Sequence, residues 1–200
     1  MERCGWCLDG GIAQKYHDEE WGQVLHEDKK HFEYLLMEAM QCGLSWTLML
    51  KKREIFRQCF DDFDYHRIAD YDEQKIQSIM DTEGMIRSRR KIEAIINNAK
   101  CFLQVIEEWG SFDKYLWSFS DYCTMVYKKH QQGFWEDRNE LSDRLSKDMK
   151  KRGFKYMGSV TVYSHLQACG MINDHECNCY KYEKLLKENK IRYIDASEVG

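Results

Sequence analysis

Cysteine and histidine residues of the kind that bind zinc lie near opposite ends of this chain. Cys4 and His17 form one pair, and His175 and Cys179 form the other, with the His-x3-Cys spacing of a zinc half-site. Two ligands cannot hold zinc against water, whereas the four together make the tetrahedral set of a closed structural site. A shared ion would join segments 175 − 17 = 158 positions apart. The spacing alone leaves open that these are ordinary residues of a chain with nine cysteines and seven histidines.

A carboxylate and several large aromatic residues indicate a second kind of chemistry. Glu38 lies at the edge of the apolar stripe of an expected helix, not opposite it. Aromatic faces attract cations, and a carboxylate selects for a hydrogen-bond donor or a positive charge. The pattern is compatible with a pocket for a flat, cationic or donor-bearing ligand, but by itself it favours tryptophans that fill the core and a Glu38 that only flanks it. The aromatic residues are Trp6, Tyr16, Trp21 and Trp46.

Basic residues are concentrated in three short segments, although the net charge of the chain is −4. These segments are residues 51–53, 84–100 and 144–155. An acidic protein with local basic clusters suits contact with phosphates at one face. Each cluster taken alone fits a solvated helix face as well.

Helices must position these residues, because apolar residues recur with helical spacing and sustained period-two alternation is missing. The chain has no proline, so glycines and Asp, Asn or Ser caps must mark the helix ends. The fold class is therefore all-α, without a sheet of any size. From Lys181 onward the sequence is charged and aperiodic, which predicts a loosely attached tail. The expected helices cover residues 32–40, 45–59, 66–79, 92–106, 112–127, 138–150 and 158–170.

One segment has the order of a helix-hairpin-helix element. A helix near Asp72–Met80 leads through Gly84 and several basic residues into a strong helix that begins near Lys91. In such an element the hairpin amides and the N-terminus of the second helix point at a DNA phosphate. Gly84 permits the backbone conformation that the turn needs. A plain helical corner gives a similar pattern.

Length and composition exclude some classes of protein. Two hundred residues can form a substantial core in one domain or two small lobes. No segment has the apolar length of a membrane span, and the N-terminus lacks the apolar core of a signal peptide. Nine cysteines without a secretory signal indicate a reducing cytoplasm, with metal ligands or free thiols in place of disulfides.

The residues introduced above occur in motifs whose order and spacing resemble the bacterial, constitutive 3-methyladenine DNA glycosylase I family of the helix-hairpin-helix glycosylase superfamily. The resemblance covers residues 1 to about 179. The loop from Cys7 to Lys15 departs from the usual family sequence. The matching blocks are Met1–Trp6, Tyr16–Gly22, Glu38–Trp46, Lys51–Glu54, Gly84–Arg87, Lys91–Ile92, Trp117–Phe119, Lys151–Lys155, Tyr163–Ser164, Gln167–Gly170 and Asn173–His175.

The resemblance implies a helix-hairpin-helix glycosylase fold with a second lobe around a single structural Zn²⁺. Residues 1–180 would form one glycosylase unit, and residues 181–200 a charged tail. The zinc lobe would take about 1–30 and 150–180, and the hairpin lobe about 31–149. The zinc ligands implied are Cys4, His17, His175 and Cys179. Four protein ligands leave no open position for catalysis, so the ion would serve stability.

The implied activity is hydrolysis of the N-glycosidic bond of 3-methyladenine after base flipping, which leaves an abasic site. By resemblance, Glu38 accepts hydrogen bonds from the base and favours its positive charge, and Tyr16 and Trp46 contact the ring. Trp6 closes the pocket wall, and Ser164 adds a polar group. The aspartate that many members of the wider superfamily carry after the hairpin has no obvious substitute here.

The implied partner is double-stranded DNA containing alkylated adenine, bound by a monomer in the bacterial cytoplasm, with no membrane. Gly43 and Leu44 would form the wedge that enters the duplex where the base left. Gly84, Arg87 and Lys91 would hold the phosphate backbone. Two alternatives stay open: a non-catalytic binder of alkylated DNA, and a zinc-stabilised helical interaction module with no DNA role.

Overall fold

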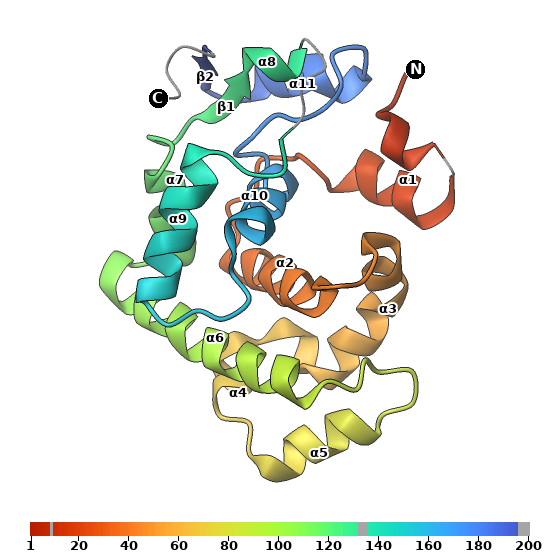
Figure 1. Cartoon of the computed structure of the whole chain (residues 1–200), viewed down its shortest axis with the longest axis vertical. Helices are drawn as coiled ribbons and strands as arrows, with labels where there is room; N and C mark the ends of the chain where they lie inside the picture. The colour runs from red at the N-terminus through yellow and green to blue at the C-terminus, as the bar shows by residue number, and fades with distance from the viewer. Residues whose placement is uncertain (9, 132–135, 196–200) are drawn as a thin grey trace.

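The computed structural model describes residues 1–8, 10–131 and 136–195, and helices dominate it (Figure 1). This confirms the all-α class. None of the helices in the described ranges is long and apolar enough to cross a membrane. The helical elements are η1 (Gly5–Cys7), α1 (Gly11–Glu19), α2 (Asp28–Gln41), α3 (Trp46–Cys59), η2 (Asp61–Phe63), α4 (Tyr65–Ala69), α5 (Glu73–Asp81), α6 (Arg89–Trp109), α7 (Phe112–Ser118), α8 (Lys128–Gln131), α9 (Glu140–Lys151), α10 (Ser159–Ala168) and α11 (Tyr180–Glu188).

The core is built around α2 and α6, which lie in the middle of the molecule (Figure 1). All ten residues from His31 to Met40 are buried, so α2 is enclosed on every side and its glutamates lie in the core as well. The ring of Phe102 on α6 lies 5.2 Å from the ring of Phe32 on α2 and 4.2 Å from the ring of Phe112 on α7, so α6 packs against both helices. A central α2 can therefore present Glu38 to a pocket from inside the core.

Side-chain caps mark the starts of several helices in this proline-free chain. Ser45 accepts a hydrogen bond from the amide of Leu48 and starts α3, and Asp72 accepts one from Lys75 and starts α5. The prediction of one helix over 66–79 is wrong, because Asp64 caps a separate short helix, α4. Asp70 and Asp72 therefore lie in a break between two helices.

The prediction of one helix over 112–127 is also wrong. The helix α7 ends at Ser118, and Asp121 and Tyr122 take positive φ angles of 52° and 57°. The next four residues form strand β1 (Thr124–Tyr127), which pairs in parallel with β2 (Ile191–Ile194). This two-stranded ribbon adds a small piece of β-structure to the helical fold.

Residues 181–195 are not the loosely attached tail that the sequence predicts. Lys181, Tyr182 and Leu185 are buried on α11, and β2 follows directly. The amphipathic stripe of α11 is short, so its helical signal is weak in the sequence, and the partner strand of β2 lies more than sixty positions earlier. Of the expected tail, residues 196–200 lie outside the described part of the chain.

Candidate pocket and metal centre

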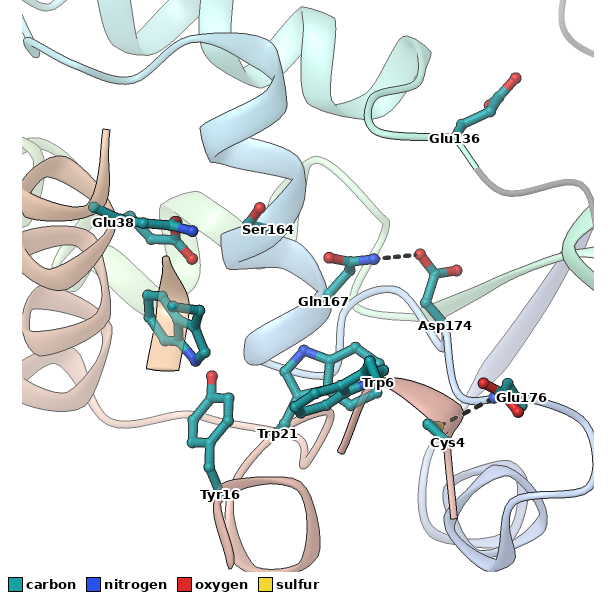
Figure 2. A pocket seen from close by; sticks show the side chains of 12 residues that line it. Cys4, Trp6, Tyr16, Trp21, Glu38, Glu136, Ser164, Gln167, Asp174 and Glu176 are labelled. Carbon is teal, nitrogen blue, oxygen red and sulfur yellow. Dashed lines mark hydrogen bonds between the residues drawn. The ribbon is translucent and has the colours of Figure 1, made fainter. Parts of the chain in front are cut away.

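A cavity of about 350 Å³ opens between α1, α2, α3 and α10 (Figure 2). Its volume lies in the range of small-molecule sites. The structure brings together every residue for which the sequence suggested a role in this pocket, although they span more than 150 positions. These residues are Trp6, Tyr16, Glu38, Trp46 and Ser164, and Trp21 lies beside them.

Glu38 supplies a buried carboxyl group to this pocket. Its side chain points from α2 into the cavity and is only 3 % exposed (Figure 2). Burial raises the pKa of Glu38 to about 8. No hydrogen bond to its carboxyl oxygens is found among the residues that the structure describes. A cationic or hydrogen-bond-donating ligand would compensate the ionised form, so the carboxyl group is set up to select such a ligand.

Tyr16 and Trp46 add two polar atoms without partners. Their rings lie 5.6 Å apart at an angle of 53°. The Tyr16 hydroxyl and the Trp46 Nε1 are buried, and neither finds a hydrogen-bond partner in the described ranges. Buried polar groups in proteins are nearly always hydrogen-bonded. Two unsatisfied donors next to a buried carboxyl group therefore indicate a polar, flat ligand. Sequence reasoning could not show this signal.

The mouth of the pocket is aromatic on one side and polar on the other. Trp6 is 45 % exposed and meets the ring of Trp21 at 5.0 Å in an edge-on arrangement. On the other side, Gln167 donates to Asp174 at 2.7 Å, and the Ser164 hydroxyl donates to a backbone carbonyl of its own helix. Gln41, Gln167 and Asp174 also line the cavity, and nothing in the sequence pattern assigns them to it.

An ion network holds α1 against α2 and α3 beside the pocket. The guanidinium of Arg53 donates to both carboxylate oxygens of Glu20, each at 2.7 Å, and to Glu33 at 2.5 Å. The hydroxyl of Tyr34 also donates to Glu20, at 3.2 Å. Bidentate guanidinium–carboxylate pairs fix orientation as well as distance. Arg53 thus fixes the end of α1, one turn beyond Tyr16, relative to the helix that carries Glu38.

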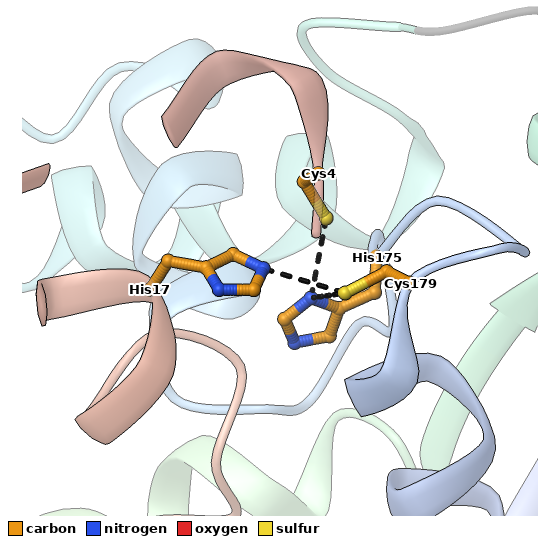
Figure 3. Close-up of side chains that lie close together, drawn as sticks. All are labelled: Cys4, His17, His175 and Cys179. Carbon is orange, nitrogen blue, oxygen red and sulfur yellow. Dashed lines mark hydrogen bonds between the residues drawn. The ribbon is translucent and has the colours of Figure 1, made fainter. Parts of the chain in front are cut away.

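The two terminal ligand pairs meet in one buried cluster (Figure 3). The Sγ of Cys4 lies 3.4 Å from Nδ1 of His175, and the Sγ of Cys179 lies 3.4 Å from Nε2 of His17. All four donor atoms lie within 4.8 Å of one another. Two thiols and two imidazoles converging in this way could hold one metal ion, and the donor set fits tetrahedral coordination.

The surroundings of the cluster also fit a metal. His17 turns its second ring nitrogen to Asp18 at 2.9 Å, and Asp18 is itself held by Arg3 at 2.9 Å. A carboxylate on the outer nitrogen fixes the tautomer and orientation of a ligating histidine. Burial lowers the pKa of His175 to about 3, so its imidazole is neutral, as coordination requires.

A second histidine–cysteine group, outside the pocket, lies in the core. His31 Nδ1 lies 3.3 Å from Nε2 of His165, and its other nitrogen faces Asp113 at 3.4 Å. Cys169 completes three possible ligands. Three ligands are one fewer than a closed structural zinc site requires. The group is a hydrogen-bonded link between α2, α7 and α10.

The residues expected to contact DNA lie on a loop and a turn near the pocket. Gly43 has a φ of 85°, and Leu44 is 39 % exposed between α2 and α3. Gly84 has a φ of 78° in the turn between α5 and α6, and Arg87 is exposed there. Lys91 lies on the first turn of α6 and donates to carbonyls at the end of α2. Contact of these residues with DNA stays a prediction.

Comparisons with known proteins agree with this geometry. The sequence model of the methyladenine glycosylase family matches residues 6–182. DNA-3-methyladenine glycosylase 1 of Escherichia coli K12 is 41 % identical over 182 residues, which is 91 % of this chain and 97 % of that protein. A crystal structure of 3-methyladenine DNA glycosylase I superposes with a TM-score of 0.83 at 39 % identity, covering 90 % of this chain and 98 % of that one. A Y16F variant of such an enzyme in complex with 3-methyladenine superposes with a TM-score of 0.84 at 33 % identity, covering 91 % and 98 %.

Proposed function

This chain belongs to the methyladenine glycosylase family, and on that premise we propose that it removes 3-methyladenine from alkylated DNA. It is a DNA glycosylase of base-excision repair: water replaces the base on the sugar, and the free base and an abasic site are the products. The observation that supports this most strongly is the buried Glu38 carboxyl group beside the unpartnered Tyr16 hydroxyl and Trp46 Nε1.

The chemistry of the damaged base explains why a site with few acid–base groups is sufficient. Methylation makes the ring cationic, so the base is already a good leaving group and needs little acid catalysis. The enzyme must flip the nucleotide, recognise the damaged base and stabilise a sugar with oxocarbenium character. An aromatic pocket in which the buried Glu38 carboxyl group has no hydrogen-bond partner among the described residues favours a cationic ring over a neutral one. Recognition of the cation is therefore the central task of the pocket.

We assign the roles accordingly. Glu38 accepts hydrogen bonds from the base and, in its ionised form, favours the positive charge. Tyr16 and Trp46 stack on or contact the base. Trp6 closes the wall of the pocket, and Ser164 contributes a polar group on the opposite side.

We propose double-stranded DNA as the substrate and a monomer as the active form. Gly43 and Leu44 enter the space that the flipped base leaves, and the turn containing Gly84 and Arg87 holds the backbone as a helix-hairpin-helix element. The site of action would be the cytoplasm of a bacterium, which is where bacterial DNA lies.

We propose that the terminal cluster holds one Zn²⁺ ion with a structural role. Cys4, His17, His175 and Cys179 supply a closed set of ligands, so the ion has no open position for substrate or water. It would tie the terminal segments, about 1–30 and 150–180, into one lobe against a hairpin lobe of about 31–149. The ion would stabilise the fold beside the pocket, because the ligand His17 directly follows Tyr16 in the sequence.

A single-turnover assay on methylated duplex DNA tests the activity. We expect release of 3-methyladenine with an equal yield of abasic sites. Tight binding without base release would instead favour a non-catalytic sensor of alkylated DNA. Absence of salt-dependent DNA binding would favour a helical interaction module with no DNA role. Every phosphate contact makes the binding constant fall more steeply with salt concentration, so a DNA-binding protein must show this dependence.

A further inference from the structure

The end of α2 has its carbonyl groups satisfied in an unusual way. The last four carbonyls of any helix lack partners within the helix. Here the amide of Leu44 donates to Gln41, and the thiol of Cys42 donates to Glu38. A lysine from a different helix serves two more carbonyls: Lys91 Nζ donates to that of Met40 at 2.7 Å and to that of Cys42, just beyond the helix, at 2.8 Å. The wedge loop, residues 42–45, thus starts from a helix end fixed by Lys91.

Lys91 is in an unfavourable place for its own helix. It is the third residue of α6, whose first turn has no acidic residue. A cation at a helix N-terminus opposes the helix dipole, whereas a cation at a C-terminus is stabilising. Lys91 therefore gains its favourable interaction from the C-terminus of α2, and burial lowers its pKa. The contact joins the first turn of the phosphate-facing helix to the wedge loop.

A second lysine joins the same two parts from the other side. Lys52 on α3, the helix that follows the wedge loop, donates to the carbonyl of Gly84 at 2.5 Å. A Cβ at Gly84 would lie 2.9 Å from Cδ1 of Ile55, so the turn packs closely on α3. The start of the wedge loop is thus tied to the first turn of α6 by Lys91, and α3, the helix after the loop, is tied to the turn between α5 and α6 by Lys52.

We infer that Lys91 is a positioning residue that holds the wedge loop rigidly on the hairpin, so that binding of the DNA backbone by the hairpin places Leu44 in the duplex. The inference rests on the proposed function. The ammonium of Lys91 donates to two carbonyls, so the inference gives it a positioning role in place of the phosphate contact that the sequence suggests. Backbone binding and base extrusion then become one event, since the hairpin and the wedge move together.

A double-mutant cycle tests whether Lys91 acts through Leu44. The variants are Lys91→Met, which keeps the length of the side chain but removes its donors, Leu44→Ala and the double variant. Misplacement of a catalytic element by about 1 Å costs up to about a hundredfold in rate, so Lys91→Met should slow single-turnover base release about tenfold or more. In the Leu44→Ala background the same change should cost less than about twofold, because the loop has already lost its wedge.

Salt dependence separates positioning from phosphate contact. Loss of one phosphate contact lowers the slope of log K against log salt by about one. We expect an unchanged slope for Lys91→Met on undamaged duplex and a slope lower by about one for Arg87→Met, the matched control. Calorimetric titration with free 3-methyladenine should give the wild-type affinity for Lys91→Met, which shows that the pocket is intact.

Additive losses in the cycle, or a slope lowered by Lys91→Met, would overturn the inference. If Lys91→Met does not fold, Lys52→Met replaces it in the same cycle, with the same non-additivity expected. A wild-type protein that releases no base would contradict the proposed function instead. The two failures are therefore distinguishable.

Discussion

Replacement of Glu38 by glutamine should make the free protein more stable, and increasingly so as the pH rises. The carboxyl group is buried, and burial raises its pKa from the ordinary 4.5 to about 8. Below pH 4.5 it is protonated in both the folded and the unfolded states and does not lower the free energy of unfolding. Between these pKa values the unfolded chain loses this proton while the folded protein keeps it, so the stability of the wild type falls with pH.

The magnitude follows from the difference in pKa. Each unit between the two values corresponds to about 1.4 kcal/mol, so the penalty reaches about 3 kcal/mol at pH 7 and about 5 kcal/mol above pH 8. Glutamine has nearly the same shape and no charge, so the Glu38→Gln protein should escape this penalty. Its free energy of unfolding relative to wild type should rise by about 1.4 kcal/mol per pH unit from pH 5 to pH 8.

Urea unfolding of both proteins at several pH values measures this difference. Glu107→Gln, an exposed carboxylate on α6, is the matched control and should show no such trend. The same Glu38→Gln protein should bind 3-methyladenine more weakly, although it is more stable. A difference in stability that does not change with pH would refute the reasoning, because Glu38 would then ionise normally in the free pocket.

Three further perturbations have defined outcomes. Cys4→Ala should lower both the zinc content and the melting temperature, as a chelator should in the wild type; lost activity at full zinc occupancy and unchanged melting would contradict a structural role. Tyr16→Phe removes an unpartnered buried hydroxyl, so denaturation should show stability unchanged or higher by about 1 kcal/mol, while calorimetry shows weaker binding of 3-methyladenine. A loss of stability would mean that the hydroxyl has a partner. Arg53→Met removes three hydrogen bonds to Glu20 and Glu33, which then share only Lys30 among the described residues, and should cost about 2 kcal/mol in urea unfolding; an unchanged value would show that Arg53 contributes nothing to stability.

The helices that pack the core were predictable, because their apolar stripes are long. Burial follows the stripe of α6 from Ile92 to Val105, and in α2 it extends beyond the stripe to all ten residues from His31 to Met40. The strand β1 was not predictable, since its four residues gain their stability from a partner far along the chain. Short segments whose pairing is non-local carry little signal of their own.

The candidate site also has features that were predictable from the sequence and features that were not. The types and spacing of the four cysteine and histidine residues were enough to suggest a shared metal, and the structure brings their donor atoms together. The unpartnered atoms of Tyr16 and Trp46 could not be predicted, because satisfaction of a buried group depends on every neighbour in three dimensions. The same holds for Lys91, whose basic character suggested a phosphate while its ammonium lies on two carbonyls.

A structure of the protein with free 3-methyladenine bound would test the central claim most directly. The proposed function predicts the base in the cavity beside Tyr16 and Trp46, with the Glu38 carboxylate within hydrogen-bond distance of a donor on the ring edge. A base bound elsewhere, or one bound in the cavity without contact to Glu38, would contradict the claim that this buried carboxyl group recognises the damaged base.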